Sequence, residues 1–229
     1  MNIVLFGPPG SGKGTQARMI AAQYNIPHIS TGDILRQQVE EGSVLGIQVK
    51  DIMAKGDFPS DAIILDILKG RLAAADCVNG YLLDGVPRTM NQAVKLDAML
   101  EEAEKSITCA IALDVPDEVL EKRLSGRFTC KMCGEAYNDY FKMTAKEGVC
   151  DACHGTQFVR RADDDAASVK NRLSVYYEKT QPVLDFYQHR DRLHSIDGTQ
   201  PIDVVEKQIE SIIKSTTYHK ALPKSFHHV

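Results

Sequence analysis

The feature that most constrains the fold is a glycine-rich loop between an apolar run and an amphipathic segment at the start of the chain. Residues 2–6 have the pattern of a buried strand, and GPPGSGKGT follows at 7–15. A helix is expected from about Lys13 to Tyr24. Glycines allow successive backbone N–H groups to turn toward one point, and the helix N-terminus adds partial positive charge there. Strand, loop and helix in this order predict a phosphate-binding loop.

The loop chemistry is that of nucleotide binding. Lys13 is expected to reach the β- and γ-phosphates. In the general pattern a Ser or Thr directly follows the lysine and binds Mg²⁺, but here Gly14 takes that place and Thr15 comes next. A direct contact between a hydroxyl group and Mg²⁺ is therefore left open. The predicted ATP-binding residues of the loop are Gly10, Ser11, Gly12, Lys13, Gly14 and Thr15.

Short apolar runs alternate with helical patterns along most of the chain. Further strands are expected at 28–29, 81–83, 107–113 and 192–196, with helices from 30, over 44–55, 61–75, 117–126 and 168–189, and from 201 onward. This alternation predicts an α/β fold whose parallel sheet is covered by helices on both faces. Residues 216–229 lack clear periodicity and are expected to form a loosely held tail.

Composition excludes several classes of protein. With 229 residues, 43% hydrophobic and 25% charged, the chain matches a soluble enzyme with one main domain and insertions. A net charge of -4 disfavours nucleic acid as the main partner. No apolar run approaches the roughly 20 residues of a membrane span, and no basic region precedes the first apolar stretch. A cytoplasmic location is therefore expected, in which thiols stay reduced.

Four of the six cysteines form two CxxC pairs separated by sixteen residues, at Cys130, Cys133, Cys150 and Cys153. Paired CxxC turns at such a spacing suit tetrahedral Zn²⁺, and disulfide pairing is disfavoured in a reducing compartment. With four protein ligands the metal has no open position, so a structural role is predicted. Fe²⁺ or Co²⁺ remain alternatives. Cys77 and Cys109 are expected to be small buried hydrophobic residues.

The chain resembles the adenylate kinase family from residue 1 to about residue 214. The matching runs are GPPGSGKGTQA at 7–17, STGDILR at 30–36, LLDGVPRT at 82–89 followed by Gln92, DVPDEVLEKRLSGR at 114–127 and RRADDDAASVKNRL at 160–173. The resemblance implies reversible phosphoryl transfer from Mg²⁺-bound ATP to AMP, giving two ADP. It also implies a P-loop core (1–29, 61–127 and 164–215), an AMP-binding helical insertion (30–60) and a metal-bound lid (128–163).

The resemblance implies roles for residues outside the loop. Arg36 and Arg88 hold the AMP phosphate, and Thr31 and Gln92 help to position the AMP base. The AMP-binding set also contains Gly85, Arg161 and Arg172. Arg123 lies against ATP, and Arg127 joins it in the ATP-binding set. Arg127, Arg161 and Arg172 close over the transferring phosphoryl group, while Asp163 and Asp164 pair with arginines when the lid closes.

Elementary chemistry is consistent with these roles. Phosphoryl transfer between two nucleotides gathers many negative charges, which arginines and Mg²⁺ can neutralise. Arg123 and Arg127 are four residues apart and are expected on one face of a helix. Asp84 ends a strand, where a carboxylate can orient Mg²⁺ through its waters. With Lys13, Asp84 and the five arginines 88, 123, 127, 161 and 172 form the predicted catalytic set.

Two positions depart from the family pattern. Val86 stands before Pro87 where the family usually has an aromatic residue, and Pro59 stands where it more often has an aliphatic residue. Both put the affinity for AMP in question. The rival interpretations are a UMP or CMP kinase and a zinc-ribbon module joined to a nucleotide-sensing domain. The long cysteine-bearing lid and the acidic net charge favour the AMP enzyme, expected as a monomer.

Overall fold

A five-stranded parallel sheet forms the centre of the computed structural model, which describes the backbone of residues 1–221 and the side chains of residues 1–217. The strand order is β2-β3-β1-β4-β8, and every pairing is parallel. The carboxyl ends of the strands therefore meet at one edge, where ligands bind in open α/β sheets. The strands are β1 (Asn2–Phe6), β2 (His28–Ser30), β3 (Tyr81–Asp84), β4 (Cys109–Asp114) and β8 (Leu193–Asp197). The predicted α/β class is confirmed.

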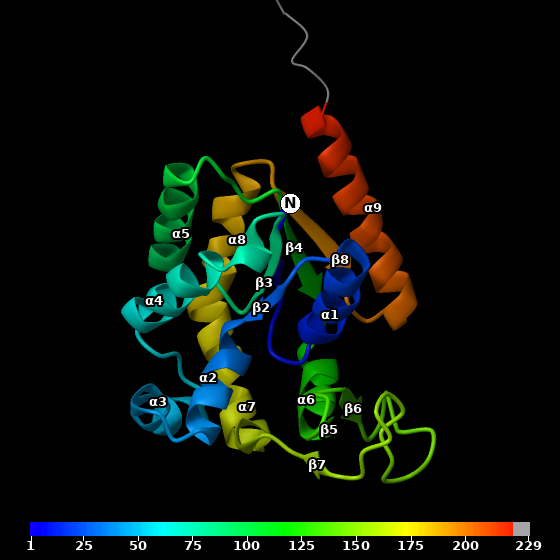
Figure 1. Cartoon of the computed structure of the whole chain (residues 1–229). Coiled ribbons are helices and arrows are strands. Elements are labelled where there is room, and N and C mark those ends of the chain that lie inside the picture. Colours follow the sequence, from blue (N-terminus) through cyan, green and yellow to red (C-terminus); the bar gives the residue numbers. More distant parts are fainter. Residues whose placement is uncertain (222–229) are drawn as a thin grey trace, which may run out of the picture.

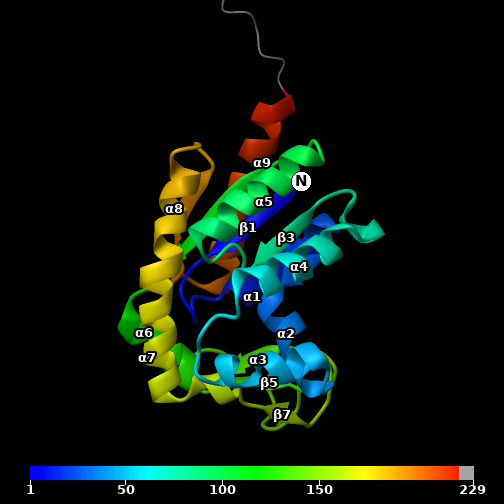
Figure 2. The ribbon, with the colours of Figure 1, turned by 90° about the vertical axis from the view of Figure 1, so that its left-hand side faces the viewer.

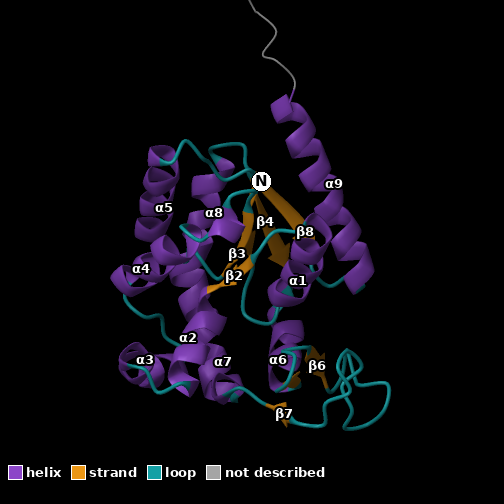
Figure 3. Cartoon of the chain, in the orientation of Figure 1, coloured by secondary structure: helices purple, strands orange, loops and turns teal. Residues whose placement is uncertain are grey.

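Helices cover both faces of this sheet (Figure 1). Helices α1 (Lys13–Tyr24) and α9 (Ile202–Ala221) lie on one face, and α5 (Met90–Glu102) and α8 (Gln181–Gln188) lie on the other (Figure 3). Alternate residues of β1 enter different cores: Ile3 and Leu5 join the cluster under α1 and α9, while Val4 and Phe6 join the opposite one. Burial on both faces explains why this strand is apolar at every position.

Residues 31–54 form two helices beside the carboxyl edge of the sheet, and a third helix then runs back alongside the sheet (Figure 2). These are α2 (Thr31–Glu40), α3 (Val44–Ala54) and α4 (Asp61–Leu72). The Ser30 hydroxyl accepts a hydrogen bond from the Asp33 amide and so caps α2, the helix that the sequence predicted to start at residue 30. Helices α2 and α3 approach closely at Gly46, where an added Cβ would lie 1.9 Å from the Gln38 carbonyl oxygen.

The cysteine-bearing segment follows α6 (Asp117–Ser125) and contains a small antiparallel sheet of order β6-β5-β7. Its strands are β5 (Arg127–Cys130), β6 (Ala136–Asn138) and β7 (Phe158–Val159). The predicted helical face shared by Arg123 and Arg127 is wrong, because α6 ends at Ser125 and Arg127 opens β5. Gly126 accounts for the early end, since it lies between the two elements and lacks a side chain that favours a helix.

The return from this segment was predicted as one helix over 168–189. The structure has α7 (Ala166–Val175), a π-helical turn (Tyr176–Thr180) and α8 in direct succession. Pro182 lacks the N–H that would bond the carbonyl of Glu178 in an α-helix, and its ring crowds that carbonyl. The wider turn before Pro182 relieves this conflict.

Other boundaries also differ from expectation. Helix α5 was not predicted, although Thr89 caps it by accepting a hydrogen bond from the Gln92 amide. Strand β4 begins two residues later than expected, and short 3-10 turns occur at Ala75–Cys77 and Ala162–Asp164. The predicted loose tail from residue 216 is wrong as far as residue 221, because α9 extends to Ala221, and residues 222–229 lie outside the described residues. No helix in residues 1–221 is long and apolar enough to cross a membrane.

Gly46→Ala should destabilise the protein by about 1–3 kcal/mol, because the new methyl group overlaps the backbone of α2 and must force the helices apart. Gly70→Ala in α4 is the matched control: among the residues that the structure describes, an added Cβ there would have no neighbour within 4 Å outside its own helix backbone. Higher helix propensity should therefore stabilise the protein by about 0.5–1 kcal/mol. Urea unfolding measures both. Equal effects of the two substitutions would contradict the close approach of α2 and α3.

Candidate active site

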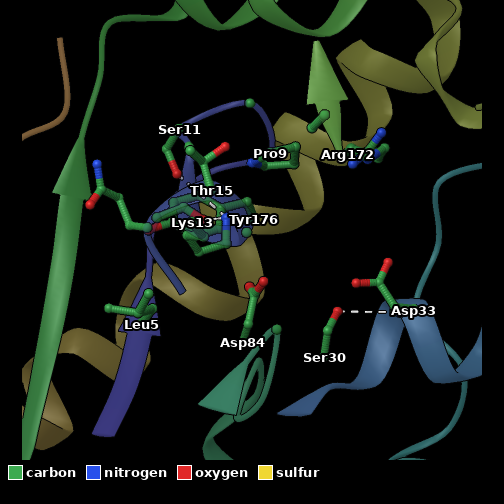
Figure 4. Close-up of a pocket in the computed structure, with 18 of the residues that line it drawn as sticks. Leu5, Pro9, Ser11, Lys13, Thr15, Ser30, Asp33, Asp84, Arg172 and Tyr176 are labelled. Carbon is green, nitrogen blue, oxygen red and sulfur yellow. Dashed lines mark hydrogen bonds between the residues drawn. The ribbon is translucent and has the colours of Figure 1, made fainter. Parts of the chain in front are cut away.

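A single cavity of about 680 Å³ brings together every residue that the sequence analysis assigned to nucleotide binding or catalysis. It lies at the carboxyl edge of the sheet, between the phosphate-binding loop, the helical insertion and the cysteine-bearing segment (Figure 4). The predicted residues in its lining are Gly10, Ser11, Gly12, Lys13, Gly14, Thr15, Thr31, Arg36, Asp84, Gly85, Arg88, Gln92, Arg123, Arg127, Arg161 and Arg172.

The phosphate-binding loop has the backbone geometry that its glycines allow. Gly10 and Gly12 have φ of 84° and 98°, values that residues with a side chain rarely adopt. At Gly10 an added Cβ would also lie 3.0 Å from the Leu124 side chain, so the loop packs directly on α6. The Lys13 ammonium donates to the carbonyls of Gly7 and Pro8 at 2.6 and 2.9 Å, which holds it inside the loop. Burial lowers the pKa of Lys13 to about 8.

Asp84 faces this loop from the end of β3 (Figure 4). Its Oδ2 lies 3.7 Å from where a Cβ on Gly14 would be, and 3.3 Å from Nε2 of His28. Burial alone would raise the pKa of Asp84, but the His28 hydrogen bond and the Lys13 charge together leave the pKa below its ordinary value. The carboxylate is therefore ionised at neutral pH and able to hold a hydrated divalent cation beside the loop.

A second group of residues is tied together around Gly85. Its carbonyl accepts hydrogen bonds from the Thr31 hydroxyl at 3.0 Å and from Nε of Arg88 at 2.7 Å. Gly85 has φ of 79°, and an added Cβ would lie 2.7 Å from the Arg88 guanidinium. A side chain at this position would therefore displace Arg88. The Gln92 side chain accepts from the Arg88 amide and donates to Asp61, both at 2.7 Å.

Arginines and aspartates from the two ends of the cysteine-bearing segment form a buried network. Arg127 makes two hydrogen bonds to Asp164, at 2.8 and 2.5 Å, and Arg172 contacts Asp163 and Asp164 at 3.0 and 2.9 Å. The side chains of Arg127 and Arg172 are only 18% and 14% exposed, so solvent screens these ion pairs weakly. The predicted pairing of Asp163 and Asp164 with arginines is present.

A further ion pair links this segment to the helical insertion. Arg161 lies 3.5 Å from Asp33, which also accepts a hydrogen bond from Arg36 at 2.5 Å. Burial would raise the pKa of Asp33, but the two arginines and the Ser30 hydrogen bond lower it to about 2. Arg123 makes a different kind of contact from these arginines: it donates a hydrogen bond to the backbone carbonyl of Gly198 at 3.0 Å.

The cavity is strongly cationic even though the chain as a whole is acidic. Nine lysine and arginine side chains line it, against four aspartates. Burial lowers the pKa of Arg88 to about 10 and that of Arg161 to about 9, so both stay charged at neutral pH in a poorly hydrated setting. Such a concentration of desolvated positive charge favours a ligand with several negative charges.

The four predicted metal ligands converge. The Sγ atoms of Cys130, Cys133, Cys150 and Cys153 all lie within 4.8 Å of one another. The Cys130–Cys153 and Cys133–Cys150 sulfur atoms are each 3.6 Å apart, which is close to the roughly 3.8 Å edge of a tetrahedron of thiolates around Zn²⁺. The donor set and its shape therefore fit a zinc ion. Cys77 and Cys109 are buried, as predicted.

Sequence reasoning missed several contacts in and around this cavity. His28 was given no role and does not line the cavity, yet its Nε2 lies 3.3 Å from Oδ2 of Asp84, which does. Phe58 and Phe141 place their rings beside Arg88 and Arg123, with the guanidinium carbons 4.6 and 5.6 Å from the ring centroids. No spacing rule finds such pairs, because the two partners come from separate segments. The TxxQ capping pattern at 89–92 was the available signal for α5, and with it for the position of Gln92.

Comparison with known proteins agrees with this geometry. The family model described as adenylate kinase matches residues 5–192. An adenylate kinase of Methanosarcina acetivorans is 50% identical over 213 residues, covering 93% of this chain and 98% of the relative. An adenylate kinase of Oceanobacillus iheyensis is 49% identical over 214 residues, covering 93% and 99%, and one of Clostridium perfringens is 46% identical over 215 residues, covering 94% and 99%. The match extends over nearly the whole of both chains in each case, and the chain therefore belongs to the adenylate kinase family of phosphotransferases.

Proposed function

We propose that this chain transfers the terminal phosphoryl group of Mg²⁺-bound ATP to AMP, reversibly, through the residues of the cationic cavity. The observation that carries the proposal is the convergence of arginines from the insertion, the core and the cysteine-bearing segment on the cavity that the phosphate-binding loop opens. One nucleotide needs only part of this charge. Two nucleotides that meet at their phosphates would use more of it.

ATP is assigned to the end of the cavity formed by residues 10–15, Arg123 and Arg127. The loop amides and Lys13 would bind its β- and γ-phosphates. The Arg123 guanidinium lies over the Phe141 ring, which supports an apolar, stacked environment for the adenine. Mg²⁺ would supply charge neutralisation at the phosphates, and Asp84 would hold it through water, with Thr15 as a second candidate ligand.

AMP is assigned to the end formed by Thr31, Arg36, Gly85, Arg88 and Gln92. Arg36 and Arg88 would bind the phosphate, since a guanidinium matches phosphate oxygens in a bidentate geometry. Thr31 and Gln92 would face the base. Gln92 is only 1% exposed and is held by both Arg88 and Asp61, so its amide orientation is fixed before AMP binds.

The transfer itself requires position and charge rather than a general base, because the acceptor oxygen of AMP is already an anion. Arg127, Arg161 and Arg172 also line the cavity, and we assign them to stabilising charge on the moving phosphoryl group. We propose the segments 30–60 and 128–163 as the AMP-binding insertion and the lid of a core formed by 1–29, 61–127 and 164–215. The Arg161–Asp33 contact joins insertion to lid, and closure there would exclude water that could otherwise hydrolyse ATP.

The assay that tests the proposal follows ADP formation from Mg²⁺-bound ATP with AMP, GMP, CMP or UMP as acceptor. AMP should be preferred by about 100-fold or more in kcat/KM, since a site with fixed polar groups rejects a base that leaves them unpaired. Preference for a pyrimidine monophosphate would make the chain the rival kinase, with Val86 and Pro59 as the first residues to examine. ATP binding without transfer to any acceptor would contradict the enzyme assignment.

Asp61→Asn should raise the KM for AMP and lower stability at neutral pH by about 1 kcal/mol, because it weakens the hydrogen bonds from Thr89, Asn91 and Gln92. Burial acts to raise the pKa of Asp61, but these bonds lower it overall. The stabilisation is therefore complete above about pH 4 and is lost as the pH falls through the lowered pKa. Urea unfolding from neutral to acid pH should show the two proteins converging. Asp66→Asn, at an exposed position of the same helix, should match wild type throughout.

We also propose that the four thiolates hold Zn²⁺ as a structural ion. The segment has only a small core, in which Phe128 packs against Tyr137 and Phe158. Most of its other residues lie in loops, so a bound metal would supply stability that this core does not. The Tyr137 hydroxyl lies 3.3 Å from the Cys150 sulfur and accepts a hydrogen bond from the Asp151 amide. These contacts would hold Cys150 in position at the proposed site.

Metal analysis of the purified protein should find about one zinc ion per chain, and Cys130→Ser should lose it and lower the melting temperature. Cys77→Ala removes a thiol elsewhere and should keep the metal. Full retention of zinc by the Cys130 variant would rule out the four-thiolate site, whereas iron or cobalt in its place would change only the identity of the ion.

The setting of the enzyme is proposed on the same grounds. Four free thiols in one cluster are best maintained in the cytoplasm. The monomer proposal is supported by a cavity that already contains every predicted residue within one chain.

A further inference from the structure

Phe58 lies beside Arg88 although the two residues belong to different parts of the molecule. Phe58 is in the loop between α3 and α4, and Arg88 precedes α5. The Arg88 guanidinium carbon is 4.6 Å from the Phe58 ring centroid. Both side chains line the cavity and both residues are half-buried. A guanidinium over a ring face at this distance makes a cation–π contact, which strengthens when water is excluded.

The remaining contacts of Arg88 leave one part of its guanidinium free. Nε donates to Gly85, the backbone amide donates to Gln92, and the backbone carbonyl accepts from the Thr180 hydroxyl at 3.0 Å. Within residues 1–217 no carboxylate forms an ion pair with Arg88, and neither of its terminal nitrogens has a hydrogen bond. By contrast, Arg36, Arg127 and Arg172 are each bound to an aspartate. Arg88 therefore keeps both terminal nitrogens available for a ligand.

We infer that Phe58 is a positioning residue for AMP, which fixes the plane of the Arg88 guanidinium so that its two terminal nitrogens meet the AMP phosphate. The inference rests on the proposed function, in which Arg88 binds that phosphate. Gly85 holds one edge of the guanidinium, and the ring of Phe58 holds one face. Together they leave a single orientation, which is what a bidentate contact with phosphate requires.

The loop that carries Phe58 is anchored on both sides. Asp61 accepts hydrogen bonds from Thr89 and Gln92 at the start of α5. Phe58 and Asp61 therefore both contact the segment 88–92. Asn171 of α7 donates to the Lys55 carbonyl and to Asp57 at 2.8 and 3.0 Å. Val86, which also precedes Arg88 closely in the chain, is 1% exposed and packs in the core. The aromatic surface beside Arg88 comes from Phe58.

The test compares Phe58→Leu with Phe58→Tyr in steady-state kinetics. Leucine keeps an apolar side chain but has no ring face, so the KM for AMP should rise about tenfold while kcat and the KM for ATP stay within about twofold of wild type. Tyrosine keeps the ring and should restore the KM for AMP. Val44→Ala, at an 86% exposed position of the same insertion, should change neither constant and controls for general disturbance.

Arg88→Met, alone and combined with Phe58→Leu, separates this inference from the proposed function. If Arg88→Met raises the KM for AMP and Phe58→Leu adds less than about twofold to it, Phe58 acts through Arg88. An unchanged KM for AMP in Arg88→Met would contradict the proposed role of Arg88 itself. If Arg88→Met impairs AMP binding but Phe58→Leu behaves as wild type, or if the two effects multiply, the inference about Phe58 is wrong.

Discussion

Mutual repulsion among the desolvated cations of one cavity is the constraint on which the rest of this structure depends. Lys13, Arg88 and Arg161 all have pKa values lowered mainly by burial. Each charge is held in place by a neighbour: backbone carbonyls around Lys13 and Arg88, and aspartates around Arg161 and Arg172. These partners stop short of neutralising the cavity. The remaining positive charge is available to bind the phosphates of a ligand.

The fold gathers these charges because it brings segments that are far apart in the chain to one edge of the sheet. Parallel strands β1 and β3 deliver the phosphate-binding loop and Asp84 side by side. The helices of residues 31–54 and the cysteine-bearing segment add further cations, and the Arg161–Asp33 pair joins the two. The cysteine-bearing segment has only a small apolar cluster of its own, and a metal bound at its four cysteines would compensate for the core that it lacks.

The sequence was informative where chemistry is local and less so where it depends on packing. The phosphate-binding loop, β1 and the CxxC pairs are short patterns with fixed spacing, and the structure places each as expected. The end of α6 before Arg127 and the π-helical turn before Pro182 depend on single residues acting against a longer helical pattern. The contacts of Phe58 with Arg88 and of His28 with Asp84 join residues far apart in the chain. The hydrophobic periodicity of a sequence does not predict contacts of this kind.

The cationic lining predicts that the cavity recognises phosphate first and the nucleoside second. Calorimetric titration of AMP and of adenosine, at one fixed salt concentration, tests it most directly. We expect adenosine to bind at least about 100-fold more weakly than AMP, because it leaves the buried guanidinium groups without an anion. Comparable affinities for the two ligands would contradict the account, since the cationic lining would then contribute nothing to binding.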